Sequence, residues 1–98
     1  SLPNAHRLTI YRAVQEALTN VQRHAQAEHV WIELSCQENA LHLFVSDDGV
    51  GIPEQLEENR FGLRGLRERV AQLGGKLDFS NREAGGAQLS LVLPLAHD

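Results

Sequence analysis

Three polar side chains recur at steps of four residues in the first quarter of the chain: Glu16, Asn20 and His24. On a helix this spacing places them in one row, with Arg23 beside it. Small neighbouring residues leave room for a ligand there. An amide oxygen with few other protein ligands suits Mg²⁺, which is usually held partly by substrate phosphates. A plain solvent-exposed helix side is the alternative, and the helix taken alone favours it.

Asp47 follows an alternating apolar run, Leu41, Leu43 and Val45, and continues its inward register. A carboxylate pointing to the core side needs hydrogen-bond donors, because burying it unpaired costs several kcal/mol. An adenine amino group is one candidate donor, and the backbone amides of the following loop are the other. Gly49 and Gly51 in that loop allow the backbone to approach a flat ligand, although Gly-x-Gly alone is weak evidence.

Gly62-Leu63-Arg64-Gly65 opens a second helical pattern. Free backbone amides and the helix dipole at such a start favour an anion, for example a triphosphate. The positive charges of Arg60 and Arg64 could assist in binding that anion. An ordinary glycine turn explains the same residues equally well.

Two helices and four strands must position these groups. The first helix is predicted from Arg7 to Ala25, after Asn4 as its cap, and the second around Leu63 to Leu73. The apolar stripe expected to face the core on the first helix is Tyr11, Val14, Leu18, Val21 and Ala25. Alternation predicts strands at 30–36, 41–45, 77–79 and 89–93, the first two forming a hairpin. The predicted fold class is α+β, a two-layer sandwich with both helices on one face of a mixed, largely antiparallel sheet.

The composition of the chain argues against several classes of function. A chain of 98 residues is one domain, and its net charge of −4 argues against a nucleic-acid partner. It has no apolar run of roughly 20 residues and its start does not resemble a signal peptide, so we expect no direct membrane contact. The single cysteine, Cys36, excludes an internal disulfide and fits a cytoplasmic location. The five histidines lack metal-ligand spacing along the sequence.

The three motifs, in this order, resemble those of the Bergerat-type ATP-binding superfamily of histidine kinases, DNA gyrase and MutL. Residues 16–25 are similar to its N box, 47–53 to its G1 box and 62–70 to its G2 region. Within the superfamily the chain most resembles histidine kinases of the nitrate/nitrite-sensor-like and degradation-regulator-like kind, which show similar Gln15–Leu18 and Leu66–Val70 segments and a short loop before the second helix. The resemblance covers nearly the whole chain.

The resemblance implies a role for each motif residue. Asn20 would ligate Mg²⁺, Asp47 would accept from the adenine amino group, and Glu16 would act in catalysis. The remaining residues expected at the nucleotide are Arg23, His24, Gly49, Gly51, Arg60, Gly62, Leu63 and Gly65. Two positions depart from the family pattern: Arg60 stands where a glycine is usual, and Ala87 where a threonine is usual.

The function so implied is that of the ATP-binding catalytic domain of a two-component sensor histidine kinase, with ATP and Mg²⁺ as cofactors. Its γ-phosphoryl acceptor would be a histidine on a separate dimerisation domain of the same homodimeric protein, and a response regulator would act downstream. None of the histidines in this chain fits the acceptor. The alternatives are a hydrolysing ATPase or anti-sigma-factor-like serine kinase of the same superfamily, and a non-catalytic nucleotide-binding interaction module.

Overall fold

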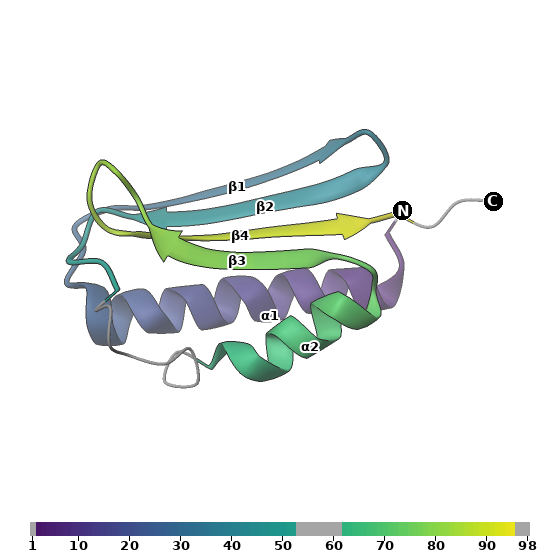
Figure 1. Ribbon diagram of the computed structural model, residues 1–98, viewed down its shortest axis with the longest axis horizontal. Coiled ribbons are helices and arrows are strands. Elements are labelled where there is room, and N and C mark those ends of the chain that lie inside the picture. The colour runs from purple at the N-terminus through teal and green to yellow at the C-terminus, as the bar shows by residue number, and fades with distance from the viewer. Residues whose placement is uncertain (1, 53–61, 96–98) are drawn as a thin grey trace.

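A computed structural model describes residues 2–52 and 62–95 of the chain. Helix α1 (Asn4–Asn20) continues into a π-helical turn, η1 (Val21–Ala25), and helix α2 spans Leu63–Gln72. The strands are β1 (Val30–Gln37), β2 (Ala40–Asp47), β3 (Lys76–Asn81) and β4 (Ala87–Pro94). Both helices lie on one side of the sheet, so the molecule has two layers (Figure 1). The predicted fold class is therefore confirmed.

The sheet has the strand order β1-β2-β4-β3, and every pairing within the described residues is antiparallel. The register sets Leu43 opposite Leu91 and Val45 opposite Leu89, so the inward faces of β2 and β4 coincide. This pairing also brings the C-terminal end of β2 beside the start of β4. The two central strands thus carry the core, and β2 ends at Asp47, which was predicted to accept a hydrogen bond from a ligand.

The core lies between this inner sheet face and the two helices. It is built largely of leucine, which fills space well in low-energy rotamers. Its fully buried large members are Leu43, Leu63, Leu89, Leu91, Leu93 and Val70. Of the second helix, Leu63, Leu66 and Val70 are buried, as the predicted spacing requires.

The core-facing side of α1 differs from the predicted stripe. Its buried residues are His6, Thr9, Ala13, Ala17 and Asn20. Tyr11 is 63% exposed and Leu18 40% exposed, so the stripe expected from apolar periodicity was wrong in these two members. Small side chains let the helix approach the sheet closely, and the larger apolar residues are displaced to its flank. As a result, the predicted polar row borders the core rather than lying far from it.

The ends of α1 also differ from expectation. Pro3 stands in the N-cap position and its carbonyl accepts from the amide of Arg7 at 3.1 Å, so Asn4 is the first helical residue and not the cap. At the other end the helix widens into the π-helical turn and stops at Gln26, whose φ is +53°. Such π-helical turns occur often at functional sites because they re-aim side chains. Here the turn holds Arg23 and His24.

Strand β1 is the edge of the sheet and is less buried than its alternation suggested. Ile32 and Leu34 are 49% and 52% exposed, although they pair with the buried Val45 and Leu43.

No helix among residues 2–52 and 62–95 is long and apolar enough to cross a membrane.

Candidate nucleotide-binding site

The carboxylate of Asp47 is buried at the end of β2, with only 5% of the residue exposed. Its Oδ1 accepts hydrogen bonds from the backbone amides of Gly49, at 2.8 Å, and Ala87, at 3.3 Å. These two bonds are the backbone alternative considered above. They leave the second oxygen, Oδ2, without a hydrogen bond from any described group. One half of the carboxylate is therefore fixed by the fold while the other half can accept from a ligand.

Residues that the motifs did not single out hold the backbone of Asp47. The Arg82 guanidinium donates to the Asp47 carbonyl at 2.7 Å and to the Gly85 carbonyl at 3.2 Å. Gly86 packs directly on Asp47, where an added Cβ would overlap the carbonyl group. The close approach of Gly86 to Asp47 became visible only once β2 and β4 were paired.

A pocket opens beside this carboxylate. Its walls come from α1, η1, the strands and the loop after β2; the lining residues are Ala17, Asn20, Val21, Val45, Asp47, Gly51, Ile52, Phe79, Ala87 and Leu89. The lining is mostly apolar with two convergent polar groups, the amide of Asn20 and the carboxylate of Asp47, as is usual for small-molecule sites. Its volume of about 30 Å³ holds little more than one or two water molecules, so a purine enters only when a wall moves.

One wall of the pocket is the loop at Gly51 and Ile52, which is hydrogen-bonded to the end of β3. The Ile52 amide donates to Asn81 Oδ1 at 2.6 Å, and Asn81 Nδ2 donates back to the Ile52 carbonyl at 3.2 Å. Gly51 has φ of +83°, and an added Cβ would stand 2.7 Å from Asn81 Oδ1. Asn81 was not foreseen from the sequence, because no motif spacing links it to position 52.

The predicted residues fall into two neighbouring spaces. Asn20 and Asp47 line the pocket, whereas Glu16, Gly62 and Gly65 line a second, larger hollow between the helices. Gly62 has φ of +72°, and a Cβ there would overlap the Glu16 carboxylate. The structure thus brings Glu16 of the first helix and the start of α2 together.

The other predicted residues have varied positions. Arg23 is exposed in η1, and His24 belongs to the same turn but its side chain lies outside the described part. Leu63 is fully buried in the core, so only its backbone is available to a nucleotide. Arg60 lies outside the described residues. Ala87 lines the pocket with a methyl group, where a threonine would bring a hydroxyl.

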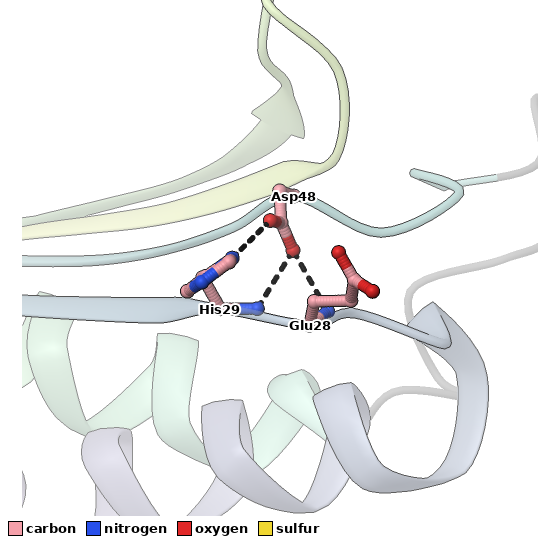
Figure 2. Close-up of side chains that lie close together, drawn as sticks. All are labelled: Glu28, His29 and Asp48. Carbon is pink, nitrogen blue, oxygen red and sulfur yellow. Dashed lines mark hydrogen bonds and ion pairs between the residues drawn. The ribbon is translucent and has the colours of Figure 1, made fainter.

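A further cluster lies just after β2, where Asp48 is hydrogen-bonded to the segment before β1 (Figure 2). Asp48 Oδ1 accepts from the amides of Glu28, at 2.9 Å, and His29, at 2.8 Å, and His29 Nδ1 lies 2.8 Å from Asp48 Oδ2. The backbone amide of His29, and then its side chain, hold the pKa of Asp48 below the usual 3.8. Potential metal-ligand atoms of these three residues lie within 4.8 Å of one another, a grouping that spacing along the sequence did not reveal. All three are exposed, and Asp48 is engaged in binding the backbone.

Comparison with known proteins identifies the family to which this fold belongs. The family model described as histidine kinase-, DNA gyrase B-, and HSP90-like ATPase matches residues 5–97. The chain belongs to this family. It is 39% identical, over 96% of its length, to the signal transduction histidine-protein kinase/phosphatase UhpB of Salmonella typhimurium, and 40% identical, over 87%, to a sensor protein NarQ homolog of Haemophilus influenzae. The predicted resemblance to sensor histidine kinases is therefore confirmed.

Solved structures agree with the fold. A blue-light activated histidine kinase of Erythrobacter litoralis superposes with a TM-score of 0.80 and 31% identity over 96% of the chain. The ATP binding domain of PrrB from Mycobacterium tuberculosis gives 0.75 and 26% over 92%. The chain spans 18% of UhpB, 15% of the NarQ homolog, 32% of the light-activated kinase and 69% of the PrrB domain. It therefore spans only part of the length of each of these relatives.

Proposed function

We propose that residues 1–98 form the catalytic ATP-binding domain of a two-component sensor histidine kinase. Asp47 carries this proposal, because its Oδ2 accepts no hydrogen bond from residues 2–52 or 62–95 and lines a pocket whose other wall holds Asn20. Adenine presents an amino donor at the position where guanine presents a carbonyl, so a fixed carboxylate acceptor selects adenine. In this proposal, Asp47 is the group that recognises the base.

The residues around Asn20 suit Mg²⁺. An amide oxygen beside a mostly apolar pocket is one ligand, and Mg²⁺ normally completes its octahedron with waters and substrate phosphates. When bound, the ion neutralises charge on the phosphates. Arg23, His24 and Arg60 are proposed to contact the phosphates, together with the backbone at Gly62, Leu63 and Gly65. Gly49 contributes to nucleotide binding by positioning Asp47, whose carboxylate accepts a hydrogen bond from the Gly49 amide.

Phosphoryl transfer needs positioning and charge neutralisation more than covalent help. A ring nitrogen of the acceptor histidine forms the N–P bond, and the bond between the γ-phosphorus and the bridging oxygen breaks. ADP leaves with that electron pair, and the second ring nitrogen gives up its proton to a base or to solvent. Glu16 is proposed to orient the incoming ring from the helix row that also holds Asn20.

The acceptor histidine belongs, in this proposal, to a dimerisation and phosphotransfer domain of the same homodimeric protein, with a response regulator as the next partner. The domain would be cytoplasmic and would bind neither nucleic acid nor membrane. A purely hydrolytic ATPase would instead release phosphate without any acceptor. Supplying the full-length protein with radiolabelled ATP separates these outcomes, because only a kinase transfers the label to its own chain.

The decisive test of the site is nucleotide affinity by calorimetry, with and without Mg²⁺. Asp47→Asn keeps an oxygen for the Gly49 amide but turns the free acceptor into a donor. Affinity for ADP should fall roughly 10- to 100-fold, since bonds to charged groups contribute about 1.5–3 kcal/mol, and the preference for ADP over GDP should shrink. Asp78→Asn, on the exposed side of β3, is the matched control. Unchanged affinity in Asp47→Asn would overturn the proposed site.

Asn20→Ala addresses the metal separately. We expect ADP to bind this variant without the gain in affinity that Mg²⁺ gives the wild-type protein. Retention of the full Mg²⁺ effect would assign the ion to other ligands.

A further inference from the structure

The larger hollow between α1 and α2 has a volume of about 340 Å³, against about 30 Å³ for the pocket beside Asp47. Arg12, Gln15 and Glu16 line it from α1, and Gly62 and Arg69 from the α2 side. A space of this size lies in the range of ligand sites, and its lining carries three charged side chains, those of Arg12, Glu16 and Arg69. The nucleotide functions proposed above use its inner rim, at Glu16, Gly62 and Gly65. Its outer part is unassigned.

The hollow is placed along α1 in a direct line from the nucleotide pocket. Asn20 lines the pocket, while Glu16 and Arg12 line the hollow, and the three residues follow one another at steps of four. Each step advances roughly 6 Å along a helix and keeps the side chains on neighbouring positions of one flank. Arg12 therefore lies one helical turn from Glu16 on the same flank of α1, inside the same hollow.

The charges of the hollow are unbalanced. Arg12 and Arg69 form no ion pair with any carboxylate of the described chain, whose helical ion pair is instead Arg64 with Glu68 at 3.9 Å. The carboxylate of Glu16 packs against Gly62 and supplies a single negative charge for the two guanidinium groups. Each guanidinium presents several donors in a fork that matches a carboxylate. The outer hollow is thus complementary to an acidic side chain.

We propose that the outer hollow is the docking site for the acceptor domain, where Arg12 and Arg69 bind an acidic side chain of the helix that carries the acceptor histidine. Docking there brings the histidine along the Arg12 flank to Glu16. This inference rests on the proposed kinase function. Exposed charges of this kind set encounter rate and register more than stability, so their removal slows phosphoryl transfer without unfolding the domain.

The test uses the full-length protein and measures the initial rate of self-phosphorylation at saturating ATP, together with ADP affinity and thermal stability. The double variant with Arg12→Glu and Arg69→Glu should phosphorylate itself at least tenfold more slowly, with ADP affinity within about twofold of wild type. The wild-type rate should fall as salt is raised, and the double variant should lose most of this dependence. Arg7→Glu makes the same charge change on an exposed position of α1 outside the hollow. It should leave the rate unchanged.

Two results would overturn the docking site while leaving the kinase function intact. One is a double variant that phosphorylates itself at the wild-type rate. The other is a loss of ADP affinity matching the loss of rate, which would assign the arginines to the nucleotide. Absence of phosphorylation in the wild-type protein overturns the kinase function and the docking site together. If charge reversal prevents folding, Arg12→Gln and Arg69→Gln remove the charges alone and are judged by the same measurements.

Discussion

Asp48 and His29, which are 19 residues apart, are joined through both the backbone and the side chain. The amide and the imidazole of His29 each lie 2.8 Å from an oxygen of the Asp48 carboxylate, and the Asp48 amide donates back to the His29 carbonyl at 3.3 Å. The connection fastens the segment after η1 to the end of β2. It therefore links the segment after the helix that carries Asn20 to the strand that carries Asp47, across the two sides of the proposed nucleotide site.

The first prediction concerns acid stability. The folded-state pKa of Asp48 is lowered below 3.8, so the stability that its charged form contributes is present above about pH 3.8 and is lost as the pH falls through the folded-state value. Urea midpoints should therefore decline more steeply on acidification in wild type than in Asp48→Asn. Asp78→Asn is the control and should keep the wild-type slope. A wild-type slope in Asp48→Asn would show that the carboxylate does not stabilise the folded chain.

The second prediction compares two adjacent glycines. Both Gly85 and Gly86 have positive φ, of +104° and +83°, so an alanine at either position is strained by about 1–3 kcal/mol. Only at Gly86 would the added Cβ also overlap the Asp47 carbonyl, since nothing lies within 4 Å of a Cβ at Gly85. Gly86→Ala should therefore destabilise the protein more than Gly85→Ala and should also weaken ADP binding. Equal losses of stability, with ADP affinity intact, would contradict the close packing on Asp47.

The third prediction concerns the wall of the pocket. Asn81→Ala removes both hydrogen bonds to Ile52, at a cost of about 1 kcal/mol or less each because the site is exposed. Hydrogen exchange of the Ile52 amide should accelerate. Since the narrow pocket must widen to admit a purine, the association rate of ADP should rise.

Asn81→Asp is the graded variant for this experiment. It retains the oxygen that accepts from the Ile52 amide and loses the donor to the Ile52 carbonyl, so its exchange rate should lie between those of wild type and Asn81→Ala. An association rate that is the same in all three proteins would mean that this wall does not control entry.

The fourth prediction contrasts Gly62 and Gly65 at the start of α2. Gly62→Ala adds strain of about 1–2 kcal/mol at a positive φ and pushes the flexible Glu16 carboxylate aside. Gly65 lies within the helix with open space at its Cβ position, so Gly65→Ala should stabilise the domain by roughly 0.5–1 kcal/mol. In the full-length protein, Gly62→Ala should lower the rate of self-phosphorylation more than the ADP affinity. A rate of self-phosphorylation equal to that of the wild type would show that the position of Glu16 does not matter for the transfer step.

Local patterns in the sequence determined much of the fold. The alternation of Leu41, Leu43 and Val45 predicted an inward strand face that the structure confirms, and it correctly carried Asp47 into a buried position. The spacing of Leu63, Leu66 and Val70 likewise predicted the buried side of α2. These features succeed because the period of a helix or strand fixes which neighbours share a face, and that period can be read without knowing what packs against it.

The tertiary structure decided which side of α1 is buried. Two apolar stripes overlap on this helix, and hydrophobicity favours Tyr11 and Leu18 over Ala13 and Ala17. Close packing against the sheet selects the small residues instead. That choice turns Asn20 to the pocket.

The pairing of β2 with β4 decided the surroundings of Asp47. Arg82 and Gly86 reach it across 35 and 39 positions of chain, as the numbering in the sequence shows. A periodic pattern defines faces but carries no information on which strands become neighbours or in what register. The sequence alone therefore predicted the buried position of Asp47, while the contacts that hold this residue in place arise only when distant strands meet.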